Sequence, residues 1–136
     1  MDVVWWASEE GRARAAADGQ RVAESREAFF STSDVVTLHV RLKPSTTGLI
    51  TADDLALMGP GSVLVNTSRA GLIAPGALKA ALDAGRPGQA AIDVFDEEPI
   101  TWTDDPLATH PRLVATPHIG FVLSLIHISE PTRHLL

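Results

Sequence analysis

Gly61-Ser-Val-Leu-Val-Asn-Thr-Ser-Arg-Ala-Gly71 is the stretch from which the fold can be inferred. An apolar run from Val63 to Val65 ends abruptly at three small polar residues, and Arg69 follows them. A short, wholly apolar run of this kind is typical of a buried strand in a parallel sheet. Ligands of open α/β sheets bind beyond the carboxyl ends of such strands. We therefore expect Arg69 to lie at a ligand-binding edge.

Apolar segments alternate with helical segments on both sides of this stretch. The expected strands cover residues 2–7, 21–22, 35–39, 63–65, 89–94 and 113–115, and the expected helices cover 9–18, 24–30, 53–58 and 75–84. Strands separated by helices indicate βαβ units with right-handed crossovers and a parallel sheet. The sequence thus predicts a doubly wound α/β domain.

Several local features define where the helices begin and which residues they bury. Thr51 and Asp54 have the spacing of a box at a helix N-terminus. Pro75 is expected at the first position of the next helix, a position that tolerates the missing amide hydrogen. In the helix over residues 24–30, Ala28 and Phe29 are expected to point inward.

Length and composition limit the class of protein. The 136 residues suffice for one domain, and 11 basic against 17 acidic residues give a net charge of −6, which argues against a nucleic-acid surface or a polybasic membrane patch. The absence of cysteine excludes disulfides and thiolate chemistry. No apolar run approaches the roughly 20 residues of a membrane span, and the start does not resemble a leader, so we expect a soluble, cytoplasmic chain.

Polar residues follow four of the expected strands. They are His39, Arg69, the segment from Asp93 to Glu98, and His118. Because parallel strands end at the same edge of a sheet, we expect these groups to converge on one crevice although they lie far apart in the sequence.

The side chains in this crevice suit acid–base chemistry on a carboxylate ligand. Arg69 offers a planar fork that can grip a carboxylate and polarise a carbonyl, unless it forms a structural salt bridge. His118 is the best acid–base candidate, and Glu98 can orient its ring and favour its charged form, although Glu98 can also be a solvated surface acid. Asp93 can accept a hydrogen bond from an amide ligand or cap its turn, and His39 can simply pack against the next loop.

Other chemistries find little support. None of the five histidines has a ligand-like spacing to a nearby acid, so no metal site is expected. Neither a G-x-S-x-G elbow nor a phosphate loop is present, and there is no G-x-G-x-x-G. A dinucleotide site therefore cannot be inferred from glycine spacing alone.

Four ordered motifs carry a resemblance to a known family. Residues 34–39 (DVVTLH), 65–71 (VNTSRAG), 91–99 (AIDVFDEEP) and 116–120 (TPHIG) resemble, in order and spacing, the NAD-binding domain of D-isomer-specific 2-hydroxyacid dehydrogenases. The resemblance covers residues 1–122. It implies a Rossmann-like fold and hydride transfer between NAD, or alternatively NADP, and a small 2-hydroxy acid or 2-oxo acid.

The resemblance also implies roles for individual residues. Arg69 would bind the substrate carboxylate and carbonyl, His118 would donate or accept the proton, and Glu98 would support His118. Asp93 would contact the nicotinamide amide. The implied cofactor-binding residues are His39, Thr67, Ser68, Asp93, Ile119 and Gly120.

The chain departs from the family pattern at both ends. The family's first strand and glycine-rich loop would precede Met1, and the substrate domain is not represented, so we expect an incomplete sheet and a fragment with little or no activity alone. Ala7-Ser8 stands where an acid normally binds the ribose, which leaves NAD versus NADP open. Residues 123–136 do not resemble the family and are interpreted as an unrelated, artefactual tail without function.

Two other interpretations of the chain stay open. It could be a non-catalytic nucleotide-sensing or corepressor-like binding module, or an unfolded gene fragment. The joint presence of Arg69, Glu98 and His118 disfavours a pure binding module, which needs no acid–base pair. Full-length relatives are expected to be homodimers, with neither nucleic acid nor membrane as partner, and the particular 2-hydroxy acid cannot be inferred.

Overall fold

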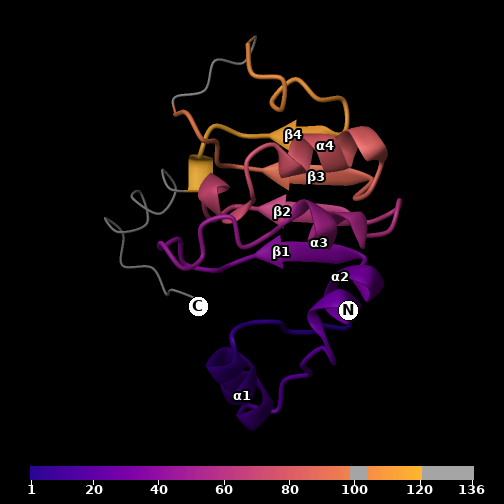
Figure 1. Cartoon of the computed structure of the whole chain (residues 1–136), viewed down its shortest axis with the longest axis vertical. Coiled ribbons are helices and arrows are strands. Elements are labelled where there is room, and N and C mark those ends of the chain that lie inside the picture. Colours follow the sequence, from indigo (N-terminus) through magenta and orange to yellow (C-terminus); the bar gives the residue numbers. More distant parts are fainter. Residues whose placement is uncertain (99–103, 121–136) are drawn as a thin grey trace.

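A parallel sheet of four strands forms the centre of the computed structural model, which describes residues 1–98 and 104–120. The strands β1 (Val35–Leu38), β2 (Val63–Asn66), β3 (Gln89–Ile92) and β4 (Leu113–Ala115) lie side by side in the order β1-β2-β3-β4. All pairs are parallel, and the arrowheads in Figure 1 point to one side. The predicted α/β class is confirmed, and the strand ends share one edge.

Two helices precede β1, and the others lie between successive strands. They are α1 (Glu9–Ala17), α2 (Arg26–Thr32), α3 (Ala52–Ala56), α4 (Ala77–Ala84) and a 3-10 turn, η1 (Ala70–Leu72). The capping box of Thr51 and Asp54 is confirmed. The expectation for Pro75 is wrong: Gly76, in the left-handed region at φ 74°, is the N-cap of α4, so the helix begins after Pro75.

The core lies on one face of the sheet. Val36, Leu64 and Ala90 are buried in neighbouring strands, and they cluster with residues of α2, α3 and α4. In Figure 1, α3 and α4 lie over this face, and the two helices contact each other. Alternation along β1 leaves Val35 58% exposed and buries Val36, as expected for a strand with one covered face.

The most deeply buried residue of α2 is Phe30; of the predicted pair Ala28 and Phe29, Phe29 packs against the core and stays partly exposed. Phe30 is 1% exposed, whereas Ala28 and Phe29 are half-buried. Arg26 forms an ion pair with Asp54 on α3, and the face of α2 that carries Arg26 therefore points toward α3. Phe30 lies four residues later on that same face.

Residues 1–23 form less strand than expected. The predicted strands at 2–7 and 21–22 are reduced to one isolated bridge between Trp5 and Val22, with hydrogen bonds from Trp5 N to Arg21 O (2.9 Å) and from Ala23 N to Trp5 O (3.0 Å). This segment and α1 lie beyond β1 in Figure 1 and belong to none of the four paired strands. With one short neighbour to pair with, the backbone of residues 2–7 forms no continuous ladder.

Three of the sequence-based expectations concern residues that are not described. The domain boundary at residue 122 and the tail over 123–136 lie outside the described residues, as does the end of the third motif at Pro99. Among the helices of the described part, none combines the length and apolar character required to cross a membrane.

Candidate active site

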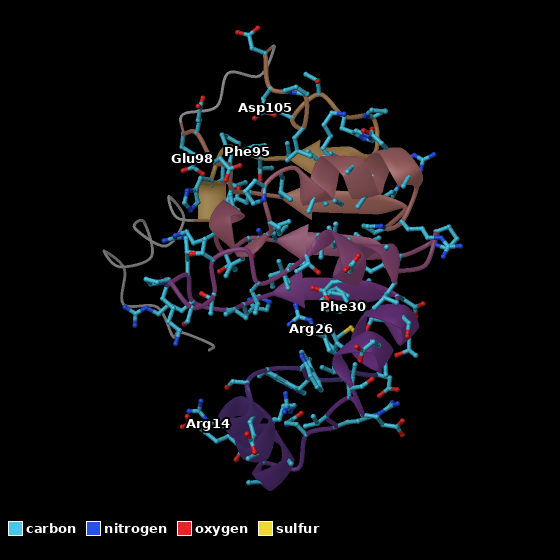
Figure 2. The ribbon with its side chains drawn as sticks, viewed as in Figure 1. Arg14, Arg26, Phe30, Phe95, Glu98 and Asp105 are labelled. Atoms are coloured by element: carbon cyan, nitrogen blue, oxygen red, sulfur yellow. The ribbon has the colours of Figure 1, made fainter. Side chains whose placement is uncertain are left out.

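The three predicted catalytic residues converge at the carboxyl edge of the sheet. They follow β2, β3 and β4 respectively, and Figure 2 shows Glu98 and Phe95 at this edge. Together they line an open hollow of about 330 Å³, whose walls are Arg69, Ala70, Val94, Phe95, Glu98 and His118. The predicted convergence of distant residues is therefore observed for Arg69, Glu98 and His118.

His118 and Glu98 form a direct contact within this hollow. Nδ1 of His118 lies 2.8 Å from Oε2 of Glu98. The other carboxylate oxygen, Oε1, accepts a hydrogen bond from the amide of Phe95 at 3.1 Å. The hydrogen bond from His118, then that from Phe95, and the nearby charge of Arg69 lower the pKa of Glu98. Glu98 is thus an ionised carboxylate at neutral pH, held in place to orient the imidazole.

Arg69 is presented by a turn that a buried side chain holds. Asn66, 1% exposed, ends β2; its Nδ2 donates to Arg69 O (3.0 Å) and its Oδ1 accepts from the amide of Ser68 (3.1 Å). The guanidinium of Arg69 is exposed, and Nη1 donates to Ser68 O at 2.7 Å. Asn66 was not among the predicted site residues, although an amide that directly ends an apolar strand is a signal for such a role.

Asp93 is buried and hydrogen-bonded to other residues of the protein, so its carboxylate does more than face a ligand. It is 4% exposed, and its carboxylate accepts hydrogen bonds from the hydroxyl of Thr116 and from the amides of Ile119 and Gly120, both at 2.9 Å. Burial raises its pKa, but these hydrogen bonds outweigh burial, so the pKa is lowered overall. Of the two roles considered for Asp93, holding its turn is the one seen directly.

The remaining predicted cofactor contacts are distributed along the same edge. Thr67 is exposed in the loop after β2, and Ser68 donates its hydroxyl hydrogen to Val40 O (3.1 Å), which ties this loop to the end of β1. His39 is exposed after β1, with Nε2 3.0 Å from Oγ1 of Thr37, and is not among the residues that line the hollow. The amides of Ile119 and Gly120 already bond to Asp93.

A parallel α/β sheet with an arginine, a carboxylate and a histidine at its carboxyl edge defines a class, namely ligand-binding domains equipped for acid–base chemistry. Residues 1–120 match the family "D-isomer specific 2-hydroxyacid dehydrogenase, NAD binding domain". The chain therefore belongs to this family, whose members are NAD-dependent D-2-hydroxyacid dehydrogenases.

Individual relatives agree with this assignment. The chain is 44% identical over 100 residues to an (S)-sulfolactate dehydrogenase of Chromohalobacter salexigens, an alignment that covers 74% of this chain and 32% of that protein. It superposes on an oxidoreductase from Ralstonia solanacearum with a TM-score of 0.85 and 47% identity, covering 90% of this chain and 35% of that one. A D-isomer specific 2-hydroxyacid dehydrogenase from Xanthobacter autotrophicus in complex with NADPH is 28% identical, with a TM-score of 0.66 over 85% of this chain and 54% of that one.

The chain therefore spans about a third of the length of the sulfolactate dehydrogenase. The family assignment and the Rossmann-like fold are confirmed, and binding of NAD(P) is consistent with both the family and the NADPH complex.

Proposed function

We propose that this chain is part of an oxidoreductase that transfers a hydride between NAD(P) and a D-2-hydroxy acid/2-oxo acid pair, acting on the CH–OH group of the donor. The observation that carries the proposal is the contact of 2.8 Å between His118 Nδ1 and Glu98 Oε2, in a hollow that Arg69 also lines. A proton-transfer pair beside a carboxylate-binding group is what this reaction requires.

His118 is the proton-transfer residue in this proposal. Because Nδ1 is engaged by Glu98, exchange of a proton with the substrate oxygen goes through Nε2. The ionised Glu98 stabilises the imidazolium that forms when a hydroxy acid gives up its hydroxyl proton, and it keeps the ring oriented.

Arg69 is the substrate-binding residue. Its guanidinium is exposed at the hollow, and a planar fork matches the two oxygens of a 2-oxo acid carboxylate. The same charge, close to the neighbouring carbonyl oxygen, stabilises the negative charge that develops there when the carbonyl is reduced.

The residues at the edge fit the nicotinamide end of the implied cofactor. Oδ2 of Asp93 accepts a hydrogen bond from the amide of Gly120 and has acceptor capacity for a carboxamide N–H as well. Thr67, directly after β2, presents its hydroxyl on the same edge of the sheet. We propose His39, Thr67, Ser68, Asp93, Ile119 and Gly120 as the cofactor-contacting set. When bound, the reduced nicotinamide supplies the hydride. The 136 residues contain no G-x-G-x-x-G for the pyrophosphate.

Further parts of the proposal concern the setting of the domain. We propose a partial NAD(P)-binding domain over residues 1–122, which the family match over 1–120 supports. We propose no function for residues 123–136. A homodimer for full-length relatives, a location in the cytoplasm and no nucleic-acid partner complete the proposal. The proton-transfer pair favours this function over that of a nucleotide-sensing or corepressor-like module.

The test is a calorimetric titration of the full chain with NADH and NADPH, with and without pyruvate as a 2-oxo acid. We expect weak but saturable heat with a nucleotide, and additional heat with pyruvate. Arg69→Ala should remove the additional heat. Arg86→Ala is the matched control, because Arg86 is also exposed but precedes β3 and so lies at the amino edge of the sheet.

Two outcomes of this experiment would contradict the proposal. If a folded chain gives no heat with either nucleotide, the cofactor assignment fails. If Arg69→Ala and Arg86→Ala behave alike, the assignment of Arg69 fails. We also expect no turnover above that of Arg69→Ala, and measurable turnover would overturn the proposal that the chain alone is inactive.

A further inference from the structure

Among the described residues, the carboxylate of Asp93 accepts hydrogen bonds from the loop that carries His118. The three donors to its carboxylate are Thr116 Oγ1, Ile119 N and Gly120 N, which flank His118 on both sides. The loop is thus joined to the end of β3 by the buried carboxylate of Asp93, in addition to the backbone hydrogen bond from Thr116 N to Ile92 O at 3.0 Å. Gly120 is close to Asp93 as well, because a Cβ at this position would lie 3.0 Å from Oδ2.

The backbone of His118 has a conformation that neighbouring residues must hold in place. Its φ is 58°, in the left-handed region that residues other than glycine rarely adopt, and its amide donates to Thr116 O at 3.0 Å. A conformation of this kind persists only where the surroundings over-determine it. The hydrogen bonds to Asp93, from two residues before His118 and from the two residues after it, supply that constraint.

The segment that follows Asp93 also carries Glu98, the residue that contacts the imidazole of His118. Glu98 follows Asp93 by five positions, and its Oε1 is anchored by the amide of Phe95. Asp93 thus connects the segment that holds Glu98 with the loop that holds His118. A hydrogen bond of 2.8 Å tolerates displacements of only a few tenths of an ångström, so the contact depends on this connection.

We propose that Asp93 is a positioning residue for His118: its carboxylate holds residues 116–120 so that the imidazole meets Glu98 through Nδ1. The proposal rests on the proposed function only in giving His118 the proton-transfer role. The positioning itself is a property of the free chain. It is additional to any contact that Asp93 makes with a nicotinamide amide.

The tautomer of the neutral His118 ring reports this positioning without any substrate. Hydrogen bonding to Glu98 requires the proton on Nδ1, and ¹⁵N chemical shifts distinguish this tautomer from the Nε2–H form. Spectra are recorded over a series of pH values, and the spectrum of the neutral ring is the one compared between variants. His118→Asn identifies the signals. We expect the Nδ1–H form to dominate in the wild type.

Two variants separate positioning from the mere charge of Asp93. Asp93→Asn should lose most of the Nδ1–H population. Thr116→Val removes one donor and leaves the charge of Asp93 in place, so a smaller but measurable loss is expected. If Asp93→Asn fails to fold, the tautomer population measured in Thr116→Val decides whether the proposal holds. Wild-type tautomer populations in the folded variants would overturn the proposal.

The matched control is Asp54→Asn. Asp54 is also a buried carboxylate, 6% exposed against 4% for Asp93, but it bonds to Arg26 and Thr51 away from the hollow. We expect Asp54→Asn to destabilise the fold and leave the His118 tautomer unchanged. A change of tautomer in this control would mean that any loosening of the fold has the same effect, and the proposal would fail. The calorimetric result with nucleotides does not affect this test.

Discussion

Arg26 on α2 and Asp54 on α3 are joined at two points, with Nε 2.8 Å from Oδ1 and Nη2 2.6 Å from Oδ2. Arg26 also donates to Leu49 O, and Oδ2 of Asp54 completes the capping box of α3. The side chain of Asp54 is 9% exposed and that of Arg26 is 33% exposed. One ion pair thus connects two helices, a loop and a helix cap.

We expect Asp54→Asn to lower the free energy of unfolding by about 2 kcal/mol, less than for a fully buried pair because Arg26 is partly solvated. Denaturant unfolding followed by circular dichroism measures the loss. Lys79→Ala breaks the exposed pair with Asp83 and should leave the unfolding midpoint unchanged. Equal effects in the two variants would contradict this account.

Stability should also fall in acid because of Asp54 and Asp93. Burial raises the pKa of both groups, but hydrogen bonds from Arg26 and Thr51 in one case, and from Thr116, Gly120 and Ile119 in the other, lower it overall. A depressed folded-state pKa stabilises the fold above the unfolded-state pKa, and this contribution is lost as the pH falls through the folded-state pKa.

The free energy of unfolding should therefore decline below about pH 4. In Asp54→Asn this decline should be shallower, since one of the groups with a lowered pKa no longer titrates. Thermal unfolding at a series of pH values measures both profiles. Parallel profiles for wild type and variant would exclude Asp54 as a source of acid sensitivity.

Phe30 and Phe29 provide a matched pair for the core. Their rings meet edge to face with centroids 5.2 Å apart, yet Phe30 is 1% exposed and Phe29 is only half-buried. Phe30→Ala should cost about 3–5 kcal/mol of stability, and Phe29→Ala clearly less. Chemical denaturation of both variants checks this order, and the reverse order would mean that the other ring faces the core.

Gly88 is required by close approach of the backbone. A Cβ at this position would lie 2.0 Å from the carbonyl oxygen of Pro60, and the amide of Gly88 donates to Ser62 O. We expect Gly88→Ala to cost about 2 kcal/mol or more, because the backbone must shift. Gly61→Ala is the control, since nothing lies within 4 Å of its Cβ position. Thermal unfolding should separate the two variants, and similar midpoints would refute the argument.

Removal of His118 should change the titration of Glu98. The hydrogen bond from His118 is the largest of the effects that lower the pKa of Glu98. In His118→Asn the pKa of Glu98 should rise toward its ordinary value, while the amide of Phe95 keeps part of the effect. Carboxyl ¹³C shifts followed against pH measure it. His110→Asn, whose ring contacts Asp83, should leave Glu98 unchanged.

Much of this arrangement could be predicted from local patterns. The run from Val63 to Val65 identified β2, and the order of strands and helices identified the edge on which Arg69, Glu98 and His118 meet. These predictions succeed because apolar periodicity and the parallel topology dictate them directly.

The remainder depends on contacts between distant residues. Phe30 is buried more deeply than Phe29 because Arg26 binds Asp54, a contact across 28 positions. The role of Asp93 toward residues 116–120 likewise requires β3 and β4 to lie side by side. No local pattern around either residue contains that information.

The parallel order of the strands also determines when the site comes into existence during folding. Every neighbouring pair of strands is joined by a crossover, so Val35 meets Val63, and Val63 meets Gln89, only after a long loop has closed. His118 and Glu98 are 20 residues apart and sit on successive strand ends. Parallel topologies fold slowly, because the chain loses the entropy of loop closure before strand pairing stabilises the closed loop. The contact between His118 and Glu98 therefore exists only once β3 and β4 have paired, so the site depends on this part of the sheet being complete.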